Sequence, residues 1–235
     1  LTDTGAVVSW GNTAFGGDPT QSSGLAQIES LSSTNKAFAA LDVNGVVHVW
    51  GDAVNGGTTP GGLTDVKQVY ATDSAFAALH ADGTVIAWGA SANGGTAPAS
   101  LTGVSEIVAS TAAFAALKQD GTVSVWGNSA NGGGATSTVY GSTAASSVSA
   151  LAGVTQIFAA DDGFAAILND GSVASWGSTS GSGYMSNAEQ SALDGSVSAV
   201  RIVNSAKAFA VLRSDGSVVA FGADPYGGGL NTYSS

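Results

Sequence analysis

The 235-residue sequence contains no cysteine, so it can form neither disulfides nor thiolate metal sites, and it has no cysteine nucleophile. Basic residues are also scarce: six Lys and Arg stand against 17 Asp and Glu, which gives a formal net charge of −11. Binding to nucleic acid or to anionic lipid relies on a surface rich in Lys and Arg. The composition therefore argues against a nucleic-acid partner and against docking on a membrane surface.

Long hydrophobic runs are missing as well. No stretch of about 18 apolar residues occurs, which excludes a transmembrane helix within these residues, and no charged segment followed by an apolar one marks a signal peptide. The first residue, Leu1, lies inside a repeat, so we expect any native leader to lie outside this sequence. Hydrophobic residues still make up 44% and are regularly placed, which favours a packed fold over disorder.

What the sequence does contain is a repeat. The segment 63–95 returns at 101–133 and at 25–57, displaced each time by 38 residues. A fixed period of this kind is typical of repeat architectures such as solenoids and propellers. We predict a single repeat domain over 1–235. Its units lie near 1–24 (partial), 25–62, 63–100, 101–150, 151–195 and 196–235, with loop insertions at 134–150 and 178–195.

Two aromatic positions anchor the units. A phenylalanine recurs within an A-F-A-A-L type segment, and an aromatic residue followed by glycine comes 12 residues later. Equivalent aromatics at one position of every unit indicate core wedges between neighbouring sheets rather than groups that stack on a ligand. These structural anchors are Phe38, Phe76, Phe114, Phe164 and Phe209, and Trp10, Trp50, Trp88, Trp126, Trp176 and Phe221.

Each unit divides into three extended segments, seen at 66–71, 75–80 and 84–88. The second alternates large and small apolar residues, so neighbouring sheets can cover both of its faces. Asp82-Gly83 separates the second segment from the third, and Asp-Gly or Asn-Gly recurs in the other complete units, which predicts a type I′ hairpin. We expect the insertion 134–150 to be a surface loop and 185–193 to hold a helical turn.

Where A-F-A-A-L-x-x-D-G-x-V-x-x-W-G repeats, the sequence resembles the regulator of chromosome condensation repeat superfamily. It is most similar to the short-repeat branch that includes the β-lactamase inhibitor protein propellers. The resemblance covers nearly the whole chain and implies an all-β fold, a β-propeller that commonly has seven blades around a central axis. Nucleotide exchange on a small GTPase is implied by the family name alone.

Two features depart from that family. Its longer members carry a Gly-Gln-Leu-Gly type segment after the Trp-Gly strand, where this sequence has Gly-Gly, as at Gly56-Gly57. In addition, five complete units and one isolated third strand are too few for seven blades. Because propellers are built from about four to eight blades, three explanations stay open: a smaller ring, a segment of a longer chain, or a ring completed by another chain.

No metal site, cofactor or catalytic residue is predicted. One Asp-Gly carboxylate per unit cannot supply the six or more oxygens that calcium prefers, and the vicinal pair Asp161-Asp162 is better explained as a solvated loop than as a cation site. His48 and His80 lack a ligand pattern and fit solvent-facing strand positions. No G-x-S-x-G segment occurs, and three glutamates make a carboxylate pair unattractive, although spatial proximity alone would suffice for one.

Aromatic residues outside the repeat pattern are the candidates for contact with a partner. Aromatic residues on loops are frequent anchors in protein interfaces, while packing within the domain is the alternative for each of them. The candidates are Phe15, Tyr70, Tyr140, Phe158, Tyr184 and Tyr226.

The sequence therefore favours a non-enzymatic structural or protein-interaction module, belonging to a larger secreted or cell-surface assembly, whose partners are other proteins or further copies of itself. Strand edges left unpaired by a partial unit invite completion by another segment. A free-standing protein-binding inhibitor or regulator is the alternative hypothesis, and a propeller that acts on or binds carbohydrate is a third.

Overall fold

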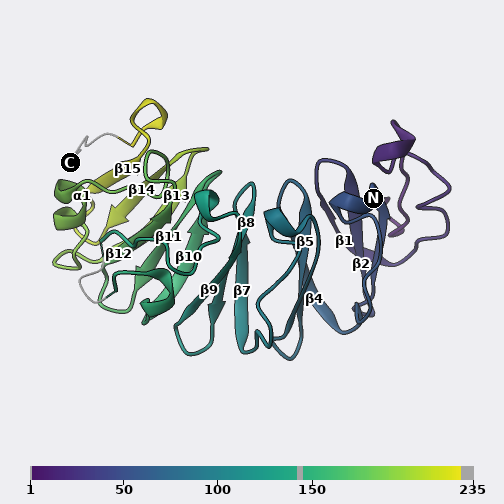
Figure 1. Ribbon diagram of the computed structural model, residues 1–235, viewed down its shortest axis with the longest axis horizontal. Coiled ribbons are helices and arrows are strands. Elements are labelled where there is room, and N and C mark those ends of the chain that lie inside the picture. Colours follow the sequence, from purple (N-terminus) through teal and green to yellow (C-terminus); the bar gives the residue numbers. More distant parts are fainter. Residues whose placement is uncertain (1, 142–144, 229–235) are drawn as a thin grey trace. The chain divides into compact units, whose positions relative to one another are not determined.

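The computed structural model describes residues 2–141 and 145–228 (Figure 1). Over these residues the protein is all-β and contains five antiparallel three-stranded sheets, each formed by strands consecutive in the chain. The sheets are β1 (Ile28–Ser33), β2 (Ala37–Asp42) and β3 (Val47–Gly51); β4 (Val66–Ala71), β5 (Ala75–His80) and β6 (Val85–Gly89); β7 (Val104–Ala109), β8 (Ala113–Lys118) and β9 (Val123–Gly127); β10 (Val154–Ala159), β11 (Gly163–Leu168) and β12 (Val173–Gly177); and β13 (Ala199–Asn204), β14 (Ala208–Arg213) and β15 (Val218–Gly222).

The chain divides into two compact units, Leu1–Val104 and Ser105–Ser235. The first holds the N-terminal segment and the first two sheets. The second holds the other three sheets, apart from Val104 at the start of β7. The sheets follow the predicted repeat, whereas the prediction of one domain over 1–235 stays a prediction.

An aromatic pair joins the second and third strands of each complete unit. In the second sheet Phe76 lies directly opposite Trp88 in the strand register, and the two rings stack with centroids 5.2 Å apart. The same pair recurs at 5.2–5.6 Å in the other sheets, with Phe221 taking the place of tryptophan in the last. Each pair contributes about 0.5–1.5 kcal/mol beyond its buried area. Ten of the eleven predicted anchors form such pairs.

Within each compact unit, the second strands pack on the neighbouring sheet, as the alternation of large and small residues predicts. All of Ala75–Leu79 in β5 is buried. Between the fourth and fifth sheets, Ala165 and Ile167 of β11 pack in one cluster with Phe209, Val211 and Phe221. Alanine at alternate positions leaves room for the bulky rings of the next sheet.

The hairpin turn differs from the predicted type I′. In the second sheet the Gly83 N–H donates to the His80 carbonyl at 3.0 Å, and Gly83 has φ +81°. Asp82 is absent from the residues with positive φ, whereas a type I′ turn needs positive φ at both central positions. The loop is a type I turn closed by a glycine bulge. Asp82 stabilises it by accepting the backbone N–H of Thr84 at 2.9 Å and the Thr84 hydroxyl at 2.7 Å.

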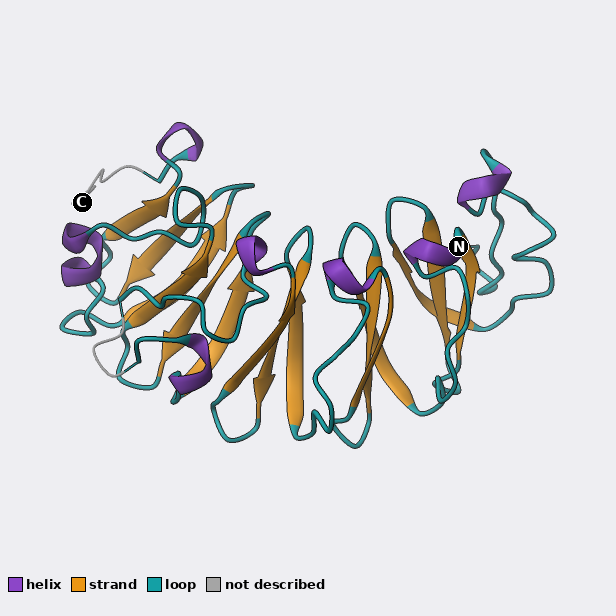
Figure 2. Ribbon diagram, in the orientation of Figure 1, coloured by secondary structure: helices purple, strands orange, loops and turns teal. Residues whose placement is uncertain are grey.

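A Gly-Gly segment follows the third strand of every sheet except the fourth, which the insertion 178–195 connects to the fifth. After β3, a short 3₁₀ turn (Ala53–Asn55) ends at Gly56 with φ +98° (purple turns in Figure 2). A Cβ on Gly56 would lie 2.6 Å from the ring of Phe76 in the following sheet, and one on Gly57 would lie 2.3 Å from the Gly51 carbonyl oxygen. The Gly56 carbonyl accepts the Trp88 indole N–H at 2.9 Å. Glycine is thus required at both positions, at Gly56 by the Phe76 ring and at Gly57 by the Gly51 carbonyl oxygen.

A hydroxyl position that the sequence analysis missed fixes the turn between the first two strands. The Thr72 hydroxyl oxygen accepts the Ala75 N–H at 3.0 Å and donates to the Asn93 carbonyl at 3.0 Å, and Thr72 is buried. Thr34, Ser110 and Ser205 make the matching bonds to the 3₁₀ turn of their own unit. The signal was present in the sequence, since a hydroxyl recurs three residues before the Ala-Phe pair.

The insertions contribute to the core more than predicted. Helix α1 (Asn187–Ala192) confirms the helical turn expected within 185–193 and starts with a capping box formed by Ser186 and Glu189. The segment 134–150 is not merely a surface loop, because Val139 and Val148 are buried in the cluster that includes Trp176. Its residues 142–144 lie outside the described residues.

Candidate interaction site

Trp10 does not occupy the core, contrary to the prediction that it is a structural anchor. Its side chain is 81% exposed, while the other four tryptophans are buried. Each buried ring lies opposite a phenylalanine on the second strand of its own sheet, whereas Trp10 lies outside the five sheets of the described residues. A large aromatic side chain is therefore presented to solvent in a position that the repeat otherwise buries.

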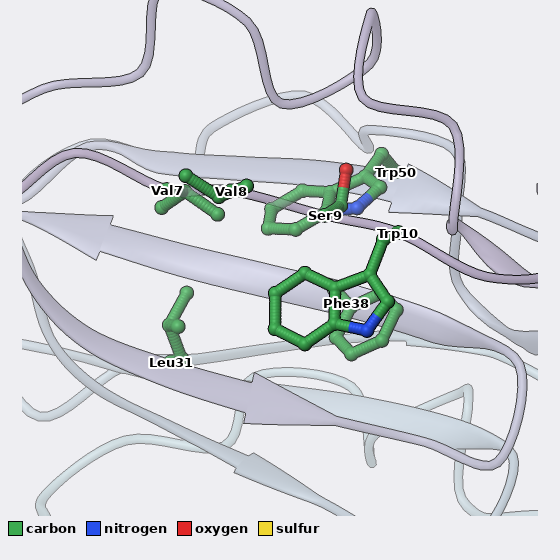
Figure 3. A pocket seen from close by; sticks show the side chains of 7 residues that line it. All are labelled: Val7, Val8, Ser9, Trp10, Leu31, Phe38 and Trp50. Atoms are coloured by element: carbon green, nitrogen blue, oxygen red, sulfur yellow. The ribbon is translucent and has the colours of Figure 1, made fainter. Parts of the chain in front are cut away.

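Trp10 lines an apolar cavity of about 340 Å³ in the N-terminal unit. Figure 3 shows Trp10 and Phe38 at one end of this cavity and Leu31 of β1 at the other. Val8 and Leu31 are themselves exposed. The other lining residues are Val7, Ser9 and Trp50. We call this the Trp10 site; its chemistry is suited to an apolar or aromatic side chain from a protein.

Phe15 extends the exposed aromatic surface of the N-terminal segment. It ends a 3₁₀ turn (Thr13–Phe15), and the Lys36 ammonium lies 5.3 Å from its ring centroid. Tyr226 occupies the same repeat position in the last sheet, where it is exposed and Lys207 lies 5.9 Å from its ring. Both candidates sit at the surface, as a role in partner contact requires.

The other aromatic candidates are held within the domain to different degrees. Tyr140 and Tyr184 contact each other edge to face at 5.4 Å; Tyr140 is partly buried beside the cluster of the fifth sheet, and Tyr184 is exposed. Phe158 packs against the same cluster, and Tyr70 is partly buried on β4. The structure thus brings Tyr140 and Tyr184 together.

Four residues of the Trp10 site were missed from the sequence: Val7, Val8, Ser9 and Leu31. Leu31 occupies the apolar position that is buried as Val69 in the next sheet, so its sequence context gave no sign of exposure. The available signal was that Trp10 belongs to no complete unit of the sequence.

The titratable residues do not form a metal-binding group. Within the described residues no three His, Asp or Glu side chains gather closely enough to hold a metal ion. Asp162 accepts the N–H and hydroxyl of Ser182 at 3.0 and 2.6 Å and pairs with Lys207 at 3.6 Å, so it holds an insertion in place rather than facing solvent. His48 contacts Asp42 at 3.2 Å.

His80 differs from the predicted solvent-facing position. It ends β5 next to the fully buried run of that strand, and its Nε2 is buried without a hydrogen-bond partner among residues 2–141 and 145–228. No acidic or nucleophilic side chain is bonded to this nitrogen in that part of the chain.

No protein-family model matches the sequence, and no curated protein matches it. Yeast RCC1 (Prp20), solved in complex with Kap60, superposes with a TM-score of 0.54 at 19% identity, over 83% of this chain and 56% of that one. The chain has the RCC1-like β-propeller repeat fold.

Two plant receptor-kinase ectodomains also superpose on this chain. The CRINKLY WD40 ectodomain of Arabidopsis thaliana ACR4 superposes with a TM-score of 0.53 at 17% identity, over 97% of this chain and 77% of that one. The Physcomitrella patens CR4 ectodomain gives 0.51 at 18%, over 83% and 50%. The chain spans little more than half the length of the two yeast structures, 56% and 57%. Identities this low establish the RCC1-like fold alone.

In the described residues, no helix of this RCC1-like chain is long and apolar enough to cross a membrane.

Proposed function

We propose that the protein is a non-enzymatic interaction module that works as a subunit or segment of a larger secreted or cell-surface assembly. The observation that carries the proposal is the Trp10 site, where a tryptophan 81% exposed lines an apolar cavity. Exposed aromatic side chains beside apolar pockets are the usual anchors of protein interfaces.

Two further observations support a protein partner. Yeast Prp20, which has the same fold, was solved bound to Kap60 and described with binding properties toward Gsp1p and histones. We carry over only the general property, binding of proteins by an RCC1-like propeller, because the identity is 19% or less. The net charge of −11 disfavours nucleic acid as the partner.

The test is the mass of the native material. We expect light scattering of the protein isolated under native conditions to give a mass well above the 22.8 kDa of this sequence, and chemical cross-links from the complex to map near Trp10 and Phe15. Protease treatment of intact cells should remove the protein if it is on the surface.

A native mass near 22.8 kDa would contradict the assembly and favour the alternative, a free-standing inhibitor or regulator.

A further inference from the structure

Four asparagines of the sequence are each followed by glycine. In an Asn-Gly pair the backbone nitrogen of the glycine can attack the side-chain carbonyl carbon of the asparagine, because glycine has no side chain to hinder the approach. The new C–N bond closes a succinimide ring and ammonia leaves. Water then opens the ring to aspartate or isoaspartate. The pairs are Asn44-Gly45, Asn55-Gly56, Asn93-Gly94 and Asn131-Gly132.

Two of these asparagines end 3₁₀ turns in which the side-chain amide is held. The Asn55 Nδ2 donates to the Asp52 carboxylate at 2.6 Å. The Asn131 Nδ2 donates to the Thr111 hydroxyl at 3.0 Å and to the Asp161 carbonyl at 3.2 Å. Closure of the succinimide requires the side chain to rotate onto the next backbone nitrogen, so these hydrogen bonds must break before the reaction.

Asn44 lies in the hairpin turn of the first sheet, where it is exposed, and within the described residues its side-chain amide makes no hydrogen bond. In the second sheet the equivalent residue, Asp82, accepts the backbone N–H of Thr84 at 2.9 Å. In the first sheet Asp42 accepts the corresponding N–H of Val46 at 3.0 Å, together with the N–H of Asn44 at 2.9 Å. Because Asp42 has taken over this bond, the Asn44 side chain plays no part in holding the turn.

The attacking nitrogens are alike in these three turns. Each glycine has a left-handed φ, and its N–H donates to the carbonyl of the residue three positions earlier. Such bonds between neutral groups differ less in strength from one another than they differ from a bond to a carboxylate. The side-chain amide is therefore what distinguishes the turns. The backbone bonds are Gly45 to Asp42 at 3.0 Å, Gly132 to Ser129 at 3.2 Å and Gly56 to Ala53 at 3.4 Å.

We propose that Asn44 is a site of spontaneous deamidation in the folded protein, while Asn55 and Asn131 are protected. The Gly45 nitrogen bonds to the Asn44 Cγ and the Cγ–Nδ2 bond breaks, so that Nδ2 leaves as ammonia with the proton from Gly45. Hydrolysis to isoaspartate inserts a methylene group into the backbone of the turn. Hydrolysis to aspartate adds one negative charge and gives this turn the residue that the other four hairpins have, Asp82, Asp120, Asp170 and Asp215. The inference is independent of the proposed function.

The experiment is incubation of the purified 235-residue chain in mildly alkaline buffer, followed by proteolytic digestion and mass spectrometry. A deamidated site gains about 1 Da. We expect Asn44 in the folded chain to react at least about tenfold faster than Asn55 or Asn131, the factor expected where one bond to a charged group or two neutral bonds must first break. In urea, where the turns are lost, the three rates should converge.

Asp52→Ala tests the protection directly, because it removes the acceptor of the Asn55 amide. Alanine already occupies the equivalent position at Ala90, where the 3₁₀ turn forms without a side-chain cap. We expect the Asn55 rate to rise at least about tenfold in this variant while the Asn44 rate stays the same. Asn44→Gln is the second control and should abolish the early mass gain. Circular dichroism and the unfolding midpoint of each variant confirm that it is folded.

A folded chain in which Asn44 reacts no faster than Asn55 and Asn131 would overturn the inference. An Asn55 rate that Asp52→Ala leaves unchanged would overturn the protection by the side-chain hydrogen bond. Equal ratios of the three rates in the folded and the urea-unfolded chain would show that the fold does not select the site.

Discussion

At the scale of single residues, buried polar groups hold the turns, and their contribution can be measured. The Thr72 hydroxyl bonds the Ala75 N–H and the Asn93 carbonyl, both at 3.0 Å. Thr72→Val keeps the shape and leaves these groups unpaired, so we expect a loss of about 1–3 kcal/mol in the free energy of unfolding measured in urea. Thr96→Val, at an exposed hydroxyl, is the control and should stay within about 0.5 kcal/mol. If Thr72→Val lowers the free energy of unfolding no more than Thr96→Val does, the hydrogen bonds of the Thr72 hydroxyl do not stabilise the turn.

The two tryptophans Trp88 and Trp176 provide a matched pair for the indole hydrogen bond. Trp88 donates to the Gly56 carbonyl at 2.9 Å, whereas the Trp176 Nε1 is buried with no partner among the described residues. Both substitutions by phenylalanine remove similar volume, but only Trp88→Phe breaks a bond. We expect Trp88→Phe to cost at least about 1 kcal/mol more than Trp176→Phe in chemical denaturation. Equal costs would show that the indole bond contributes nothing to stability.

At the scale of elements, alanine substitutions at Gly56 and Gly227 distinguish the energetic cost of backbone strain from the cost of a close contact with the next sheet. Both have φ +98°, but an added Cβ at Gly56 would lie 2.6 Å from Phe76, whereas one at Gly227 would meet no atom of residues 2–141 and 145–228 within 4 Å. Alanine at either position costs about 1–2 kcal/mol for the left-handed backbone. We expect Gly56→Ala to cost a further 1–3 kcal/mol or so, because the Phe76 ring must move. The comparison is made by thermal unfolding at low concentration, and similar losses for both variants would argue against the close approach.

The elements could be predicted from the sequence where one unit repeats another. The Phe76–Trp88 pair, the three strands of each unit and the helical turn near Glu189 follow from local periodicity and capping residues. The turn type could not be predicted, because Asp-Gly suits both a type I′ turn and a type I turn with a glycine bulge. The exposure of Trp10 and Leu31 was also missed, since burial depends on which sheet lies beside a strand and periodicity describes only the strand itself.

At the scale of the whole molecule, the carboxylates in the hairpin turns make the free energy of unfolding depend on pH. The hydroxyl and backbone N–H of Thr122 hold the pKa of the Asp120 carboxyl below its usual value, and Ser172 does the same for the pKa of Asp170. A lowered pKa in the folded state stabilises the fold at pH values above the unfolded pKa, about 3.9, and this stability is lost as pH falls through the folded pKa. Asp82 and Asp215 have lowered pKa values for the same reason.

We therefore expect the urea concentration at the midpoint of unfolding to stay constant between about pH 7 and 5 and to decrease below about pH 4. Asp120→Asn should reduce the steepness of that fall, because the amide oxygen can still accept the Thr122 bonds but does not titrate in this range. A midpoint that is the same at about pH 6 and pH 3 would contradict a stabilising role for these turns.

The exposure of Trp10 also has an optical consequence. Four of the five tryptophans are stacked and buried, so their emission is shielded from water-soluble quenchers, and Trp10 alone is open to iodide. The quenchable part of the emission therefore reports on one side chain without any label. Any molecule that covers the N-terminal segment, in a purified sample or in native material, will reduce the quenching of Trp10 fluorescence by iodide.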